Sequence, residues 1–435
     1  MRGDLARERY LQRHIEAGLP AYSFSAPHWH NVLVLPAYRE APDLLQRLTA
    51  VPAGSGTTLL ILVLNRPDSD PDPLANALLR TALDKHSANL VARSGVPVLR
   101  LNTHTDLYLL DMETLYGPNP ANCGVGLARK AGCDLALLWM NAGGISGKWL
   151  CSTDADATLP ADYFHRLEDV ATSAAAAVFP FRHTPAGDSV CDHATALYEL
   201  RLHHYVLGLE YARSPYAYHT LGSALAITAS AYAQVRGFPK RAGAEDFYVL
   251  NKLAKVGPIA RLQGRSIELQ SRRSARVPFG TGPAVDSIMT NTQIDDAALF
   301  YHPVCYQALR AVLAVIPALA QSPVTAIAQQ CVAQDLPPDL AQQIQSVLTA
   351  MDIAAALQHC RQHGKSSAQF QRQFHQWFDG FRTLKFIHAL RDAGWSQLSL
   401  QQLNALQPML WPSDHADITG IEGLCNSVRH HWGWR

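Results

Sequence analysis

The sequence lacks several features that would define its class. Its eight cysteines form no Cys-x-x-Cys pair, which argues against a zinc site or a disulfide framework and favours reduced thiols. The charged N-terminus has no apolar segment of the signal-peptide kind. The best membrane candidate, residues 309–319, contains Pro317 and is shorter than the roughly 20 residues that cross a bilayer. We therefore expect a soluble, cytoplasmic protein without a transmembrane span, and peripheral membrane contact stays open.

An excess of charge of one sign is also lacking. The 37 basic and 36 acidic residues leave a net charge of +1, so the overall charge does not predict a nucleic-acid partner. The hydrophobic content of 48% can fill a sizeable core. A length of 435 residues is enough for two or three domains.

The order of apolar runs predicts an α/β fold with a mainly parallel sheet. We expect a helix and connector over residues 1–30, an α/β domain over 31–299, and a helical region over 300–435, where glutamine and alanine dominate. The expected strands span residues 31–35, 59–64, 96–101, 135–139, 149–153, 177–181 and 266–269. The expected helices between them span residues 43–48, 73–83, 126–131, 162–172, 194–211 and 245–256.

A pair of carboxylates follows one of these apolar runs. Residues 149–160 read Trp-Leu-Cys-Ser-Thr-Asp-Ala-Asp-Ala-Thr-Leu-Pro, so Asp154 and Asp156 point the same way if the chain is extended. Two carboxylates at the carboxyl end of a strand suit Mg²⁺ or Mn²⁺, which completes its shell with phosphate oxygens. The alternative is an ordinary turn in which the aspartates cap the backbone.

The first two expected strands also end in polar groups. Residues 35–40 read Leu-Pro-Ala-Tyr-Arg-Glu, and a proline at a strand end exposes the groups that follow it. Tyr38 could then cover a flat base, and Glu40 could accept hydrogen bonds from the base or its ribose. Asn65, after the second strand, is placed to pair with the edge of a base. The alternative for residues 35–40 is a plain connector from strand to helix.

A glycine-rich segment opens the next expected helix. Residues 124–132 read Gly-Val-Gly-Leu-Ala-Arg-Lys-Ala-Gly, and such a helix could point Arg129, Lys130 and its first amides at a diphosphate. The third glycine and the acidic partner of a dinucleotide fingerprint are missing, so we do not predict NAD binding. The alternative is a solvated helix face.

Other polar and aromatic residues are expected to be structural. Asp68 and Asp70 are expected to cap the following helix. Neighbouring histidines on a helix diverge in direction, so the histidine pairs are expected at a surface or interface rather than at a metal. These pairs are 203–204 and 430–431. Tryptophans 29, 139, 149, 432 and 434 are expected in the core or at domain contacts rather than as sugar platforms.

The ordered series of motifs resembles the family 2 glycosyltransferases, which are nucleotide-sugar-dependent enzymes of the GT-A fold. The resemblance spans roughly residues 31–285, and it rests on the order of the motifs rather than on any one of them. The segments that carry it are residues 35–40, 128–132, 153–156 with the proline after them, 222–238 ending in Gly-Phe, and 242–253 with an early Glu-Asp pair.

The resemblance implies transfer of a sugar from a nucleotide-diphosphate sugar to an acceptor hydroxyl, with inversion. Asp246 would be the base that takes the hydroxyl proton, and Glu245 would shape the acceptor site. Asp154 and Asp156 would hold Mg²⁺ or Mn²⁺, which stabilises the diphosphate leaving group. The acceptor, whether a glycan, a lipid-linked group or a small molecule, is not assigned. The other residues expected to contact substrate are Pro36, Ala37, Tyr38, Glu40, Asn65 and Arg129, with Asp154 facing the ribose or sugar.

One departure from the family pattern concerns the metal. The family often adds a later histidine as a third ligand, but no histidine occurs between His219 and His302. Three arginines, Arg272, Arg273 and Arg276, stand there instead, before a Gly-Thr-Gly turn. They could clamp a phosphate of the donor or of the acceptor; the alternative is a charged surface loop.

Two further functions compete with the glycosyltransferase. The segment after the strand also resembles the nucleophile motif of haloacid-dehalogenase-type phosphatases, in which Asp154 would attack phosphorus and Asp156 would be the acid/base. That motif normally opens its domain, whereas here a full strand–helix series precedes it. The second competitor is a non-catalytic nucleotide-sugar-binding scaffold with the helical region as a partner surface. A GT-A nucleotidyltransferase is disfavoured because its glycine-rich, lysine-bearing loop is missing after the first strand.

Overall fold

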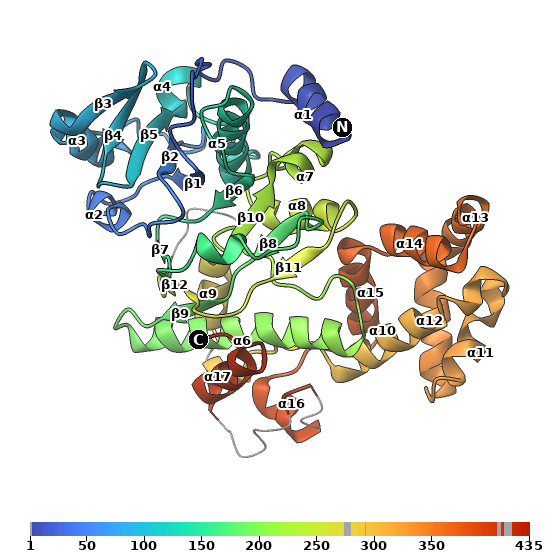
Figure 1. The fold of residues 1–435 in the computed structure, drawn as a ribbon. Coiled ribbons are helices and arrows are strands. Elements are labelled where there is room, and N and C mark those ends of the chain that lie inside the picture. The colour runs from blue at the N-terminus through green and yellow to red at the C-terminus, as the bar shows by residue number, and fades with distance from the viewer. Residues whose placement is uncertain (1, 274–279, 292, 407–409, 413–419) are drawn as a thin grey trace. The chain divides into compact units, whose positions relative to one another are not determined.

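The computed structural model describes residues 2–273, 280–291, 293–406, 410–412 and 420–435 (Figure 1). The chain divides into two units, which are described separately. Unit 1 comprises residues 1–192, 220–286 and 432–435, and unit 2 comprises residues 193–219 and 287–431. The boundaries between them fall within helices α6 (Ser189–Tyr211) and α9 (Thr281–Met289), between residues 219 and 220, and near the end of the chain.

Unit 1 contains two sheets in the part of the chain that the structure describes. The larger is nine-stranded with the order β11-β8-β10-β6-β1-β2-β5-β4-β3, and the smaller has the order β7-β12-β9. The strands of the large sheet are β1 (Asn31–Ala37), β2 (Thr58–Leu64), β3 (Leu90–Arg93), β4 (Val96–Arg100), β5 (Thr105–Asp111), β6 (Trp149–Ser152), β8 (Ala176–Val178), β10 (Leu225–Thr228) and β11 (Ile259–Arg261). Those of the small sheet are β7 (Ala157–Thr158), β9 (Phe181–Thr184) and β12 (Ile267–Gln270).

The centre of the large sheet is parallel. Strands β6, β1, β2 and β5 run in one direction, with Val34 opposite Ser152 and Ala37 opposite Leu64. Every residue of β2 is buried, as expected for a strand covered on both faces. The carboxyl ends of β1, β2 and β6 therefore meet at one edge, where α/β sheets bind their ligands.

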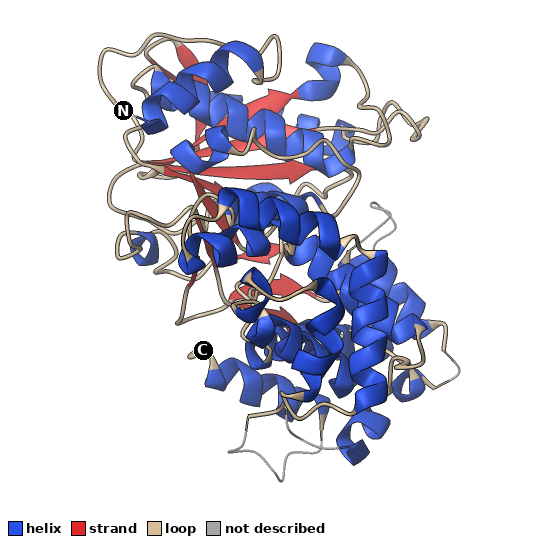
Figure 2. Ribbon diagram, turned by 90° about the vertical axis from the view of Figure 1, so that its right-hand side faces the viewer, coloured by secondary structure: helices blue, strands red, loops and turns tan. Residues whose placement is uncertain are grey.

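Helices lie on both faces of this sheet (Figure 2). The longest of them wholly within unit 1, α5 (Gly124–Asn141), packs on β1 and β2. Gly132 permits this close approach, because a Cβ there would lie 2.8 Å from Cγ2 of Val63. The other helices of unit 1 are α1 (Arg2–Arg13), α2 (Leu44–Leu48), α3 (Ala77–Lys85), α4 (Met112–Tyr116), α7 (Ala229–Gln234) and α8 (Glu245–Leu253).

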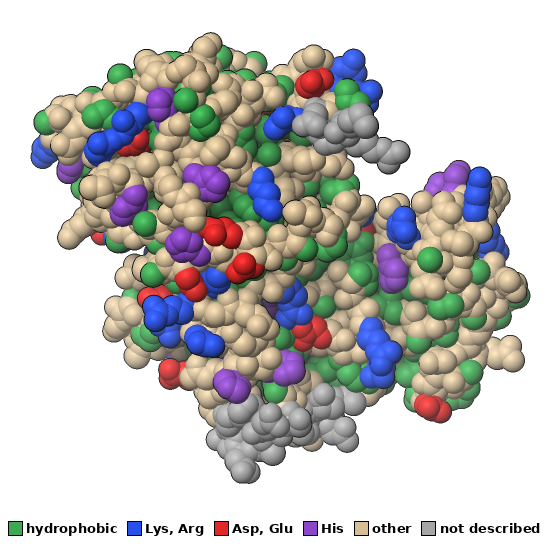
Figure 3. Space-filling model, viewed as in Figure 1, with side chains coloured by type: hydrophobic (Ala, Val, Ile, Leu, Met, Phe, Trp, Pro, Cys, Tyr) green, Lys and Arg blue, Asp and Glu red, His purple; other side chains and the backbone are tan. Residues whose placement is uncertain are grey.

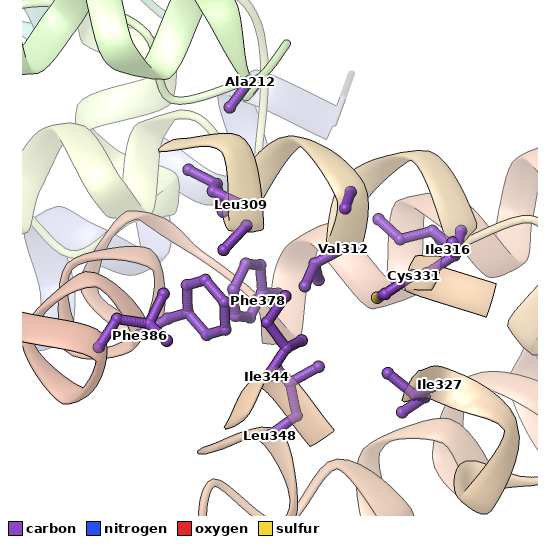
Figure 4. Close-up of a cluster of buried hydrophobic side chains, with 14 of the residues drawn as sticks. Ala212, Leu309, Val312, Ile316, Ile327, Cys331, Ile344, Leu348, Phe378 and Phe386 are labelled. Carbon is purple, nitrogen blue, oxygen red and sulfur yellow. The ribbon is translucent and has the colours of Figure 1, made fainter. Parts of the chain in front are cut away.

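The described part of unit 2 is helical. Its apolar residues recur at helical spacing, so several of its helices present one face to a shared core, part of which is drawn in Figure 4. Phe378, Phe386 and Ile344 meet there from three different segments. The helices after α9 are α10 (Pro303–Val315), α11 (Ile327–Val332), α12 (Pro338–Ala350), α13 (Ile353–His363), α14 (Ser367–Trp377), α15 (Gly380–Asp392), α16 (Leu400–Leu406) and α17 (Ile421–His431).

The α/β fold class with a helical C-terminal region is confirmed, and all eight cysteines are free thiols in the structure. Among the described residues, no helix combines the length and the hydropathy needed to cross a membrane. Two element predictions were wrong. Residues 135–139 lie inside α5, because a helix buried on all sides has the same continuous apolar run as a buried strand. Residues 162–172 form only a short 3-10 turn, His165–Leu167.

His203 and His204, expected at a surface or interface, do not lie at a surface. Both are buried in unit 2, where His204 packs against Phe300 and Tyr306 and burial lowers its pKa to about 3. His203 forms a hydrogen bond with the carboxylate of Glu199, four residues earlier on the same helix. The core prediction for the five tryptophans is confirmed, since all five are buried.

Candidate functional site

The candidate site begins one residue beyond the parallel strands. The amide of Thr153 donates to the carbonyl of Val34 at 3.1 Å, and the amide of Asn65 donates to that of Ala37 at 3.1 Å. These bonds extend the ladders past β6 and β2 and hold the following loops in register with β1. Asp154 and Asp156 therefore start from a fixed backbone at the carboxyl edge of the sheet.

Arg129 joins two carboxylates that are distant in sequence. It projects from α5 and is 3% exposed; its Nε donates to Oε1 of Glu245 at 2.8 Å, and its Nη2 donates to Oδ1 of Asp154 at 2.5 Å. Its Nη1 donates to Oγ of Ser152 at 2.7 Å and to the carbonyl of Thr153 at 3.3 Å. Burial acts to lower the pKa of Arg129, but the two carboxylates outweigh it and raise that pKa. Arg129 therefore clamps the end of β6 to the start of α8.

A glycine makes room for this clamp. Gly222 precedes β10, and a Cβ at that position would lie 2.8 Å from Cζ of Arg129. Ordinary contacts to a Cβ are longer than this, so the guanidinium could not keep its position beside an alanine. The small residue at 222 is thus matched to the arginine on α5.

Asp246 is the second residue of α8, next to the clamped Glu245. Helix α8 starts after Ala244 in a left-handed conformation, φ 58°, and the amide of Phe247 donates to Oδ1 of Asp246 at 2.7 Å. Burial and the adjacent charge of Glu245 raise the pKa of Asp246 to about 7. A carboxylate with this pKa can accept a proton near neutral pH, which suits a general base.

Asp156 and Glu40 share an arginine from a third segment. Nε of Arg272 lies 2.8 Å from Oδ2 of Asp156, and its Nη2 lies 3.6 Å from Oε1 of Glu40. The small sheet brings them together, because β7 pairs with β12 and the register places Ala157 opposite Leu269. Figure 3 shows acidic and basic side chains interspersed over the region of β7, β9 and β12. Arg272 was one of three candidate phosphate arginines.

The residues expected along the nucleotide lie at the same edge. Pro36 and Ala37 are buried within β1, and the side-chain Nδ2 of Asn65 also donates to the carbonyl of Ala37, at 3.2 Å. The hydroxyl of Tyr38 donates to Oδ2 of Asp70 at 2.6 Å. Base contact by these side chains stays a prediction.

The prediction that Asp68 and Asp70 cap the next helix was wrong. Helix α3 begins after Asn76, which makes no side-chain cap. Asp70 binds Tyr38 and also Arg39, at 2.9 and 2.8 Å, while Asp68 accepts the amide of Ala121 at 2.8 Å. Both carboxylates hold loops rather than a helix end.

The proposed diphosphate contact of Lys130 and of the first amides of α5 was wrong as well. Lys130 is buried and donates to Asp134 at 2.6 Å and to Tyr10 at 2.6 Å. The amide of Gly126 donates to the carbonyl of Arg241 at 3.0 Å, so a loop covers the start of the helix. Neither group faces the site, and the solvated-face alternative fails equally because Lys130 is not solvated.

The remaining arginines differ in their surroundings. Arg273 is 66% exposed, and its Nε donates to Oδ1 of Asp286 at 2.8 Å. Arg276 lies outside the described residues. Their roles in phosphate binding stay predictions.

The predicted cation ligands are two carboxylates. Among the described residues, no group of three or more histidine, cysteine, aspartate or glutamate side chains could hold a metal. Asp154 is 38% and Asp156 is 20% exposed, so ligand oxygens can reach both. Mg²⁺ commonly binds one or two carboxylates and takes phosphate oxygens and water for the rest. The pair fits a cation that arrives with a phosphate ligand better than one held by protein alone.

Sequence reasoning missed the partners within the site. Ser152 was assigned only to a strand, and Gly222 only to a motif. Arg272 was a candidate phosphate arginine, but its contacts with Asp156 and Glu40 were not predicted.

Comparison with known proteins gives distant structural matches. Neither a protein-family model nor a curated protein sequence matches the chain. S. aureus TarS residues 1–349 in complex with UDP-GlcNAc matches at 13% identity over 93% of this chain and 91% of that chain, with a TM-score of 0.34. The mannosyltransferase PcManGT from Pyrobaculum calidifontis, in complex with GDP-Man and Mn²⁺, matches at 14% identity over 91% and 96%, with a TM-score of 0.36. TM-scores this low do not assign a function.

Proposed function

We propose that the chain is a GT-A-type glycosyltransferase that moves a sugar from a nucleotide-diphosphate sugar to an acceptor hydroxyl. The observation that supports this most is the Arg129 clamp between Asp154 and Glu245. The clamp brings Asp246, whose pKa is about 7, beside the carboxyl edge of the parallel strands. A nucleotide would bind at that edge. A donor edge and a base side by side are what sugar transfer to a hydroxyl requires.

In this proposal Asp246 takes the proton of the acceptor hydroxyl as its oxygen attacks the anomeric carbon. The bond from that carbon to the diphosphate breaks in line, so the configuration inverts. Burial and the adjacent charge of Glu245 keep the pKa of Asp246 high. Glu245, which is held by Arg129, would form one wall of the acceptor site. Arg129 is a positioning residue here, since its N–H groups go to the protein rather than to a diphosphate.

Asp154 and Asp156 would hold Mg²⁺ or Mn²⁺ together with the donor. The cation supplies charge stabilisation for the diphosphate leaving group. Tyr38, Glu40 and Asn65 would line the nucleotide, with Pro36 and Ala37 beneath it.

Ligand binding and transfer test the proposal. The intact protein with Mn²⁺ is screened by thermal shift with UDP, GDP, UDP-GlcNAc and GDP-mannose, since a ligand at 100 times its Kd stabilises the fold by about 2.7 kcal/mol. The stabilising donor is then used in a transfer assay with Asp246→Asn and with Asp392→Asn, an exposed carboxylate paired with Arg391, as control. Transfer should be lost in the first variant only.

Other outcomes point to the competing functions. Metal-dependent phosphate release from sugar phosphates without any nucleotide would favour the phosphatase. Donor binding with no transfer to any acceptor tested, unaltered by Asp246→Asn, would favour the scaffold. If neither a nucleotide nor a nucleotide sugar raises the melting temperature, the proposal is wrong.

A further inference from the structure

Arg272 is ion-paired with Asp156, a carboxylate that the proposed reaction assigns to a cation. We propose that Arg272 is a positioning residue that competes with the divalent cation for Asp156 and moves to the diphosphate when cation and donor bind together. This inference rests on the proposed function, because it takes the donor diphosphate as the group that receives the arginine.

The backbone delivers Arg272 to this place. The β7–β12 pairing puts Asp156 next to the end of β12, and the buried Ser271 donates its amide to the carbonyl of Thr184 at 3.0 Å. The chain is therefore anchored immediately before Arg272. The position of its guanidinium depends on the side chain, which is 32% exposed and has room to change rotamer.

The charges of the site explain why an arginine lies there. Five carboxylates gather at this edge, at Glu40, Asp154, Asp156, Glu245 and Asp246, and among the described residues Arg129 and Arg272 are the arginines that contact them. The Arg129 guanidinium is buried against Glu245 and Asp154. Arg272 lies beside two others, Asp156 and Glu40, and offsets the repulsion between their charges.

A cation at Asp156 cannot coexist with Arg272 in its present place. Both bind the carboxylate oxygens, and a guanidinium within about 4 Å of a divalent ion is repelled by it. A diphosphate resolves the conflict, because its oxygens accept both metal coordination and a forked arginine contact. Metal and nucleotide should therefore bind cooperatively, and each should raise the affinity of the other by the same factor.

Direct binding measurements distinguish an Arg272 that competes with the cation from an Arg272 with a structural role alone. Mn²⁺ binding to the intact protein is measured by titration calorimetry without nucleotide and again with saturating UDP or GDP, whichever stabilises the protein in the thermal screen. The variants are Arg272→Gln, Asp156→Asn, and Arg182→Gln as matched control. Arg182 belongs to β9 of the same small sheet and pairs with Glu268, so its loss removes a nearby charge without touching Asp156.

We expect Arg272→Gln to tighten Mn²⁺ binding without nucleotide by about two- to fivefold, the range that a partly exposed ion pair supports. The same variant should reduce the enhancement of Mn²⁺ affinity by nucleotide, while Arg182→Gln changes neither quantity and Asp156→Asn abolishes binding. Unchanged or weaker Mn²⁺ binding in Arg272→Gln would overturn the inference, as would Mn²⁺ binding that survives Asp156→Asn.

The two proposals can fail independently. Tightened Mn²⁺ binding in a protein that transfers no sugar would support the competition at Asp156 and count against the glycosyltransferase. Transfer that proceeds normally, with Mn²⁺ affinity insensitive to Arg272→Gln, would keep the glycosyltransferase and remove the role of Arg272.

Discussion

Nε of Arg129 lies 2.8 Å from Oε1 of Glu245, although 116 residues separate them in sequence. Both side chains are buried, at 3% and 5% side-chain exposure, so the pair has left water and depends on its hydrogen bonds. The same arginine reaches Asp154, so one guanidinium joins the loop after β6 to the start of α8. Its consequences for stability and activity can be measured.

Replacing Arg129 by methionine should strongly destabilise unit 1. The change leaves the Glu245 carboxylate buried without its partner, and breaking a buried ion pair from one side costs about 3–5 kcal/mol. Chemical denaturation followed by tryptophan fluorescence measures the loss. The double variant Arg129→Met with Glu245→Gln should recover part of it, and a double variant as unstable as the single one would show that the pair is not the cause.

Gly222→Ala should lower activity strongly, although it adds only one methyl group. The added Cβ would displace the Arg129 guanidinium, and with it Asp154 and Glu245. We expect a loss of about 1–3 kcal/mol in stability, typical of overpacking, together with a fall in transfer rate. Gly420→Ala is the control, since a Cβ there meets no atom of the described residues within 4 Å. Equal behaviour of the two variants would contradict the steric match.

The strand ends were predictable from sequence, and the partnerships between them were not. Apolar runs located β1, β2 and β6, and the parallel sheet then required Glu40, Asn65 and Asp154 to share an edge. Lys130 and Arg129 are neighbours in sequence with equivalent local patterns. Their surroundings differ, because Lys130 contacts Tyr10 and Asp134 whereas Arg129 contacts Glu245. The contacts with Tyr10 and Glu245 are distant in sequence and cannot be predicted from the local pattern.

The Asp246 carboxyl predicts the pH dependence of activity. With a pKa of about 7 and a role as base, it must be ionised, so kcat/KM should rise about tenfold per pH unit below 7 and level off above it. The profile is measured with saturating metal. An Asp392→Asn control should keep the same profile, and a rate that stays constant from pH 5 to 8 would exclude Asp246 as the base.

The same carboxyl makes a separate prediction for stability. A folded-state pKa raised from 3.8 to about 7 means that the folded protein binds the proton more tightly than the unfolded chain. Its contribution to stability is fully present below pH 4 and is lost as the pH rises to about 7, because the ionised form is disfavoured by burial and by Glu245. Asp246→Asn removes this cost and keeps an oxygen that can accept the Phe247 amide. The variant should therefore be more stable than the parent by about 1–3 kcal/mol at pH 8 and nearly equal to it at pH 4. Denaturation curves at both pH values test this, and a variant that is inactive but no more stable at pH 8 would mean that Asp246 is not held as a strained carboxylate.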